Sequence, residues 1–131
     1  MESIKERFTL SKEERLCSRK ALEELFEGSN KSIMAYPIRV VYQKTEETGT
    51  RIMVSVSKRF FKRAVKRNRI KRQLREAYRL TKHILKPANG GLNIAFLWNS
   101  NDMLPTARVM EKMQNLLNKI NESVADIPPS V

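Results

Sequence analysis

Apolar residues recur along the chain at two spacings, one typical of helices and the other of strands. Residues 19–27 (RKALEELFE) place four apolar side chains on one side, which predicts a short helix. Residues 36–43 (YPIRVVYQ) and 51–57 (RIMVSVS) alternate apolar and polar positions and are rich in β-branched side chains, which predicts two strands. The polar segment 44–50 lies between them, so we expect a hairpin in which these strands pair antiparallel.

The same two patterns return in the second half of the chain. A helical spacing begins near residues 62–66 and continues to about residue 85. Its apolar positions are Ile70, Leu74, Ala77, Tyr78, Thr81 and Leu85. Residues 92–98 (LNIAFLW) predict a third strand, and Pro105 precedes a closing amphipathic helix that ends near Ala125. The predicted order is α-β-β-α-β-α, an α+β sandwich with a small sheet and a basic central helix.

The length of 131 residues suits a single domain with one core. Residues 1–17 are charged and irregular and predict an extended arm, and residues 126–131 predict a flexible tail. The first residues lack the apolar segment of a signal peptide, and no apolar run approaches the roughly 18 residues that span a bilayer. With one cysteine, Cys17, the chain forms no internal disulfide. We therefore expect a cytoplasmic protein without a membrane partner.

The positive charge is concentrated in one segment, residues 58–82. This segment holds 12 of the 26 lysines and arginines and one acid, Glu76, so it carries a net charge of +11 out of a total of +12. The rest of the chain, with 14 basic and 13 acidic residues, is close to neutral. A single cationic element on a balanced chain suggests three kinds of partner, namely nucleic acid, an anionic membrane surface or an acidic protein.

A helical wheel divides this segment into an apolar side and a cationic side. The polar positions opposite the core side are Asn68, Lys71, Arg72, Arg75, Arg79 and Lys82. Like charges at i,i+3 and i,i+4 repel, so a polyanion that relieves the repulsion should bind well. Arginine and lysine suit backbone phosphates, and Asn68 can both donate and accept a hydrogen bond, as a 2′-hydroxyl or base edge requires.

Two other interpretations of the basic segment fit the sequence less well. A charged helix side is often just solvated surface, but such surfaces usually mix both signs, and this one does not. Binding to a membrane or to a calmodulin-like protein requires a free apolar side, whereas the apolar side of this helix is needed for the core.

No catalytic or metal-ligating constellation stands out in the sequence. His83 is the only histidine and lies near a helix end, and Cys17 has no second ligand residue nearby. Phe96 and Trp98 fit a strand pattern and are expected in the core rather than as base-stacking platforms. We therefore expect that the polypeptide alone is not an enzyme and holds no metal ion.

The basic segment resembles the signature of the bacterial ribonuclease P protein subunit. The residues that carry the likeness are 54–59 (VSVSKR), 64–72 (AVKRNRIKR) and Arg75, and the central Arg-Asn-Arg is the most characteristic tripeptide of that family. The match joins a strand to a helix over about 20 residues, and the order of elements agrees over nearly the whole chain. This resemblance implies a single RNA-binding domain over residues 1–131.

The resemblance implies a role in the maturation of tRNA. The family's protein binds a large catalytic RNA, and the ribonucleoprotein removes the 5′ leader from precursor tRNA by endonucleolytic cleavage. The RNA and its Mg²⁺ ions perform the chemistry, while the protein supports RNA folding and holds the leader. The residues that the resemblance assigns to RNA binding are Lys58, Arg59, Lys62, Lys66, Arg67, Asn68, Arg69, Lys71, Arg72, Arg75 and Arg79.

The resemblance also implies a second site and an unusual topology. A cleft between the first helix and the sheet holds the single-stranded leader in this family. The residues at the matching places are Leu22, Phe26, Val40 and Tyr42. The family has a left-handed crossover between the strands that flank the basic helix, against the general preference for the right hand.

The alternative function is a general RNA- or DNA-binding chaperone or a ribosome-associated protein that has no enzymatic partner. Both functions use the same cationic helix. They differ in whether the protein assists cleavage of precursor tRNA by a ribonuclease P RNA.

Overall fold

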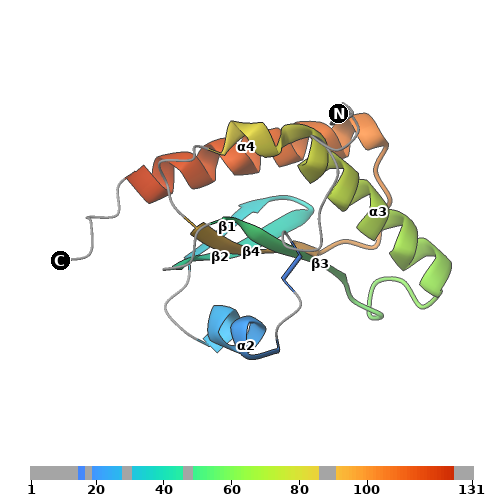
Figure 1. The fold of residues 1–131 in the computed structure, drawn as a ribbon. Coiled ribbons are helices and arrows are strands. Elements are labelled where there is room, and N and C mark those ends of the chain that lie inside the picture. The colour runs from blue at the N-terminus through green and yellow to red at the C-terminus, as the bar shows by residue number, and fades with distance from the viewer. Residues whose placement is uncertain (1–14, 17–18, 28–30, 46–48, 86–90, 126–131) are drawn as a thin grey trace, which may run out of the picture.

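A computed structural model describes residues 15–16, 19–27, 31–45, 49–85 and 91–125 (Figure 1). The predicted extended arm lies largely outside these residues, and the predicted tail lies wholly outside them. The elements are α2 (Arg19–Glu27), β1 (Lys31–Ala35), β2 (Ile38–Thr45), β3 (Arg51–Val56), α3 (Ala64–Thr81), the 3-10 turn η2 (Lys82–Ile84), β4 (Gly91–Trp98) and α4 (Thr106–Ala125). No described helix has the length and apolar character that crossing a membrane requires.

The four strands form one sheet in the order β1-β2-β4-β3. β2 pairs antiparallel with β1 on one side and with β4 on the other, whereas β3 pairs parallel with β4. The predicted hairpin between β2 and β3 is therefore wrong, because β4 lies between them. β4 is buried on both faces along most of its length, which requires a central position in the sheet.

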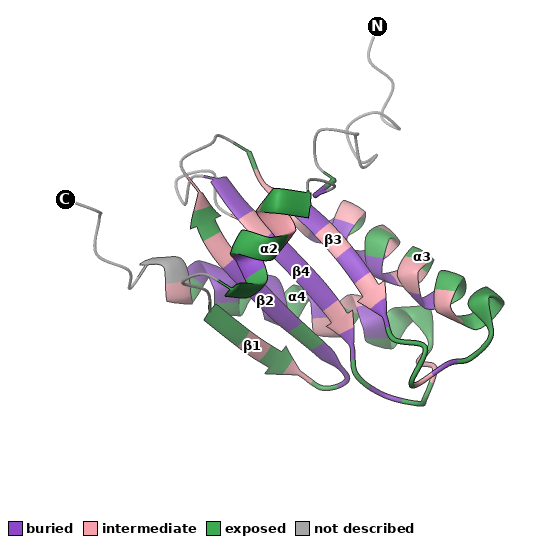
Figure 2. Cartoon of the chain, turned by 90° about the horizontal axis from the view of Figure 1, so that it is seen from below, coloured by how far each residue is buried: buried purple, intermediate pink, exposed green. Residues whose placement is uncertain are grey.

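Helices cover the two faces of the sheet unequally (Figures 1 and 2). α3 and α4 lie side by side on one face, where α3 contacts β3 and α4 contacts β1. Of the helices in the described part of the chain, α2 is the one on the other face, where it contacts β2 and β4. The main core lies under α3 and α4 and includes Tyr42, Tyr78, Phe96 and Trp98, with the Tyr78 and Phe96 ring centroids 5.8 Å apart. A smaller apolar cluster lies under α2.

The α+β class and the single sheet with packed helices are as predicted, with one additional strand. β1 was not predicted, because only Ile33 and Ala35 of this edge strand pack inward and Met34 between them is 44% exposed. Tyr36 and Pro37, predicted to begin a strand, instead form the turn between β1 and β2. α3 links two parallel neighbours, β3 and β4, and the left hand of this crossover stays a prediction.

Residues just before α2 pair with the outer edge of β3. Arg15 bridges to Ile52 in parallel, and the backbone N–H of Leu16 donates to the Ile52 carbonyl at 2.7 Å. The Leu16 side chain is buried in the small cluster that also holds Leu25 and Val41. This segment therefore closes part of an edge strand and anchors the start of α2 against the sheet.

Candidate nucleic-acid interface

α3 presents one side to the core and the other to solvent. Its buried residues are Ile70, Leu74, Ala77, Tyr78 and Thr81, which confirms the predicted core positions within the helix. The helix begins at Ala64, inside the predicted range 62–66. Its first two turns, residues 64–69, contain no buried residue, because this end of α3 reaches past β3 (Figure 1).

The outer side of α3 is cationic. The cationic face, as the term is used below, consists of Asn68, Lys71, Arg72, Arg75, Arg79 and Lys82. Asn68, Arg72 and Arg75 are exposed, and the other three residues are half-buried. Glu76 binds the Arg79 guanidinium through both carboxylate oxygens, with Arg79 Nε donating to Oε2 at 3.2 Å. This pair offsets the charge of Arg79, so the exposed charge is concentrated at Arg72 and Arg75.

A second cationic group precedes the helix, in residues 58–63, here called the basic turn. Lys58, Arg59, Lys62 and Arg63 are all exposed. The Arg59 guanidinium carbon lies 5.8 Å from the centroid of the Phe60 ring, in a cation–π contact. The basic turn leads directly into α3, so the two cationic groups follow each other along the chain.

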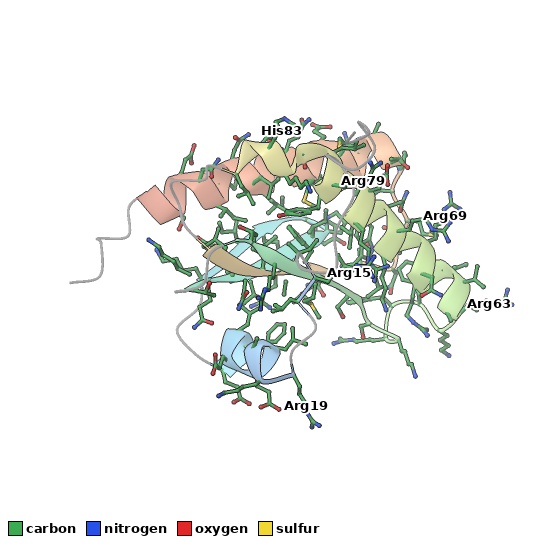
Figure 3. The ribbon with its side chains drawn as sticks, in the orientation of Figure 1. Arg15, Arg19, Arg63, Arg69, Arg79 and His83 are labelled. Carbon is green, nitrogen blue, oxygen red and sulfur yellow. The ribbon has the colours of Figure 1, made fainter. Side chains whose placement is uncertain are left out.

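Arg67 differs from its two neighbours in the central tripeptide. Its Nη1 donates to the carbonyl oxygens of Phe61 and Lys62, each at 2.8 Å. Asn68 and Arg69 are exposed, and Arg69 points away from the body of the protein (Figure 3). The tripeptide therefore directs one side chain toward the basic turn and two toward solvent.

A polar contact fixes α3 against the segment that leads into α4. Gln73 Nε2 donates to the Leu104 carbonyl at 3.1 Å and to the Thr106 hydroxyl at 3.3 Å. Pro105 lies between these two acceptors and immediately precedes the first residue of α4. This contact helps to hold the cationic face on the outside of the helical layer.

The comparisons with known proteins agree with this arrangement. A family model described as Ribonuclease P matches residues 10–121. The chain belongs to the ribonuclease P protein family. A ribonuclease P protein component of Porphyromonas gingivalis is 44% identical over 125 residues, which cover 89% of this chain and 90% of that protein. Another, of Chlorobaculum tepidum, is 38% identical over 82 residues, which cover 52% of this chain and 53% of that protein.

Solved structures of ribonuclease P proteins share the fold. The Thermotoga maritima protein superposes with a TM-score of 0.69 at 26% identity and covers 81% of this chain and 96% of its own. The Staphylococcus aureus protein gives the same TM-score at 22% identity, with 82% and 94% covered. As a family member, the chain is a protein subunit of ribonuclease P, part of an endoribonuclease complex that processes tRNA. The alternative of a chaperone with no enzymatic partner is not favoured.

Most of the predicted RNA-binding residues lie on the surface of the basic turn and α3. The predicted RNA-binding residues Lys58, Arg59, Lys62, Lys66, Asn68, Arg69, Arg72 and Arg75 are exposed, and Arg67, Lys71 and Arg79 are half-buried. Their contacts with RNA stay predictions. No described set of three or more His, Cys, Asp and Glu residues is grouped so that it could hold a metal ion.

The leader-cleft prediction was wrong for two of its four residues. Val40 and Tyr42 are buried in the main core, on the face of the sheet that α3 and α4 cover. α2, with Leu22 and Phe26, lies on the opposite face, where Val41 packs under it. Because alternate strand residues point to opposite faces, the prediction was off by one position along β2.

Two exposed residues at the start of α3 were not among the predicted RNA-binding residues. Val65 is 79% exposed, seven residues before Arg72 and therefore in line with it along the helix. Arg63 points outward from the tip of the helix (Figure 3). The sequence signal for Val65 was an apolar residue on the polar side of the wheel. The helical wheel does not apply to Arg63, because this residue precedes the first residue of α3.

Proposed function

We propose that the basic turn and the cationic face bind the catalytic RNA of ribonuclease P. The observation that carries this proposal is the one-sided charge of α3, which has seven cations and one acid. Glu76, that acid, binds Arg79 and leaves the exposed Arg72 and Arg75 available to phosphates. An arginine guanidinium can bind two phosphate oxygens at once, and phosphates neutralised in this way release their counterions. This surface therefore suits the folded backbone of a large RNA.

In this proposal the protein binds and positions RNA, and the RNA subunit catalyses cleavage of the precursor tRNA. The family resemblance supports this division, in which the RNA and its Mg²⁺ ions supply the chemistry of leader removal. The contribution of the protein is the neutralisation of crowded phosphates, which lets the RNA fold and retain Mg²⁺ at low concentrations of that ion. The cations of α3 and the basic turn are the residues suited to that task.

The proposed partner for the opposite face of the sheet is the 5′ leader of precursor tRNA. α2 covers Val41, Ala95 and Met53 and leaves the end of the sheet near the β1–β2 turn uncovered (Figure 2). The next row of side chains on this face crosses all four strands and is called the open row below. Its members, paired in register, are Met34, Arg39, Leu97 and Ser55.

The open row has the mixed chemistry that single-stranded RNA requires. Met34 is 44% exposed, Arg39 is exposed, and Leu97 and Ser55 are half-buried. Arg39 Nε donates to the Ser32 hydroxyl at 3.1 Å, which orients its guanidinium over the sheet. Four strands about 4.8 Å apart give a row about 14 Å long, and its β3 end leads toward the basic turn. Bases would lie on the apolar positions and a phosphate on Arg39.

Phe26 is the only aromatic residue of α2 and is 45% exposed, whereas Leu22 is half-buried in the small cluster. An exposed ring on the helix above a partly open sheet is suited to stacking on a leader base. Phe26 is therefore the proposed base contact of α2, and the Val41 face of β2, not the Val40 face, forms the floor below.

Reconstitution tests the proposed function. The full chain is mixed with a bacterial ribonuclease P RNA and a precursor tRNA at an Mg²⁺ concentration where the RNA alone cleaves poorly. The expected result is restored cleavage at the mature 5′ end. The control is a lysine-rich peptide added at an equal total charge. Stimulation no greater than that of the peptide would favour a general polycation effect and contradict the proposal.

A further inference from the structure

Arg67 lies in the most basic part of the chain, yet its charged group is directed inward. Its Nη1 donates to two backbone carbonyls of the basic turn, those of Phe61 and Lys62, each at 2.8 Å. A guanidinium nitrogen that donates to two carbonyls makes charge-assisted hydrogen bonds, which are stronger than neutral ones. The side chain thus reaches back from the first turn of α3 to the segment that precedes the helix.

The other end of the same turn is fixed by Ser57. Its carbonyl accepts from the N–H groups of Phe60 and Phe61 at 3.1 and 3.3 Å, and its hydroxyl accepts from the Arg59 N–H at 3.1 Å. The Phe61 side chain is buried in the main core. The backbone of the basic turn is therefore held at its start by Ser57, at its centre by Phe61 and at its end by Arg67.

The start of α3 lacks the usual means of fixing a helix end. The N-cap residue Arg63 makes no side-chain capping bond, and the first turn contains no acid. Arg67 supplies a different constraint, because it joins the helix to the two residues before Arg63. Without the Arg67 hydrogen bonds, the backbone that carries the cations of the basic turn would be less ordered.

We propose that Arg67 is a positioning residue, which holds the basic turn so that Lys58, Arg59 and Lys62 meet the RNA as a preformed set. This inference rests on the proposed function, that α3 and the basic turn bind the catalytic RNA. It assigns the central tripeptide two tasks. Asn68 and Arg69 face the RNA, whereas Arg67 acts through the turn and improves RNA affinity by reducing the ordering that binding requires.

A double-mutant cycle distinguishes positioning from direct contact. Arg67→Ala is measured in the wild-type chain and in a background in which Lys58, Arg59 and Lys62 are all replaced by alanine. Affinity for ribonuclease P RNA is determined at low salt. If Arg67 acts through the turn, its replacement lowers affinity about fivefold or more in the wild type and less than about twofold in the background. Arg69→Ala, the matched control, should cost the same in both.

Equal losses for Arg67→Ala in the two backgrounds, or no loss in either, would overturn the proposal.

Amide exchange of the free protein gives a second readout, because the Phe60 and Phe61 N–H groups report on the turn. Arg67→Ala should accelerate their exchange, and Arg69→Ala should not. If Arg67→Ala fails to fold, the cycle is run with Arg67→Met, which keeps the aliphatic part of the side chain but has no donor for the Phe61 and Lys62 carbonyls. A wild-type chain that does not bind the RNA would instead contradict the proposed function itself.

Discussion

The arginines of α3 differ in what their side chains already bind. Arg79 is held by Glu76, and Arg67 is held by carbonyls of the basic turn. Arg72 and Arg75 are exposed on the cationic face. A phosphate must compete with an existing partner at Arg79 and Arg67. Arg72 and Arg75 make no hydrogen bond or ion pair with another described side chain. We therefore expect Arg72 and Arg75 to supply most of the phosphate contacts made by the cationic face.

Replacement of Arg72 should change the salt dependence of RNA binding. Each lost phosphate contact lowers the slope of log affinity against log salt by about 0.7–0.9. The prediction is therefore a reduction of this size for Arg72→Ala, measured by titration of ribonuclease P RNA at several salt concentrations. Arg19→Ala is the control, because Arg19 lies on α2, across the sheet from α3 (Figure 3). An unchanged slope for Arg72→Ala would place the RNA elsewhere.

Replacement of Phe26 should affect the leader selectively. Stacking of one base on an aromatic ring contributes about 1–3 kcal/mol, so Phe26→Ala should lower the preference for precursor over mature tRNA by about fivefold or more. The measurement compares the affinities of the reconstituted enzyme for the two tRNAs. Phe26→Leu keeps the apolar contact without the ring and should recover little of the preference. Equal weakening for both tRNAs would mean that Phe26 is only structural.

At the scale of elements, helices were predicted well and strand neighbours were not. α2, α3 and α4 each have a clear apolar stripe, and a stripe of this kind is a local property of the sequence. The position of β4 between β2 and β3 depends on long-range pairing, which a period-2 pattern does not report. One signal was present, because Ala95 and Leu97 are apolar on the face opposite Ile94 and Phe96. A strand that is apolar on both faces belongs at the centre of a sheet.

The position of α3 depends on a few fully buried side chains. Leu74 is completely buried between the helix and the main core, and Leu80 on the same helix is 38% exposed. Leu74→Ala should lower the free energy of unfolding by about 2–5 kcal/mol, because it removes buried methyl groups and leaves a cavity. Leu80→Ala, the matched control, should cost about 1 kcal/mol or less. Urea denaturation measures both, and similar losses would contradict the assigned orientation of the helix.

At the scale of the whole molecule, the sheet separates two surfaces of different charge. α2 has two cations and three acids, whereas α3 has seven cations and one acid. A folded RNA is attracted to the α3 side, which leaves the less basic α2 side for a single strand. The cationic face could be predicted because charge and helical period are both local. The cleft could not, because a shift of one residue along β2 exchanges Val41 for Val40 and reverses the face.

The central claim is that the cationic face is the RNA-binding surface of a ribonuclease P subunit. The most direct test measures precursor-tRNA cleavage by ribonuclease P RNA at low Mg²⁺ with the wild-type chain, an Arg72→Ala/Arg75→Ala variant and a Lys119→Ala control on α4. The account predicts strong stimulation by the wild type and the control. It predicts that the double variant loses most of that stimulation while keeping the wild-type unfolding curve. Undiminished stimulation by the folded double variant would contradict the claim.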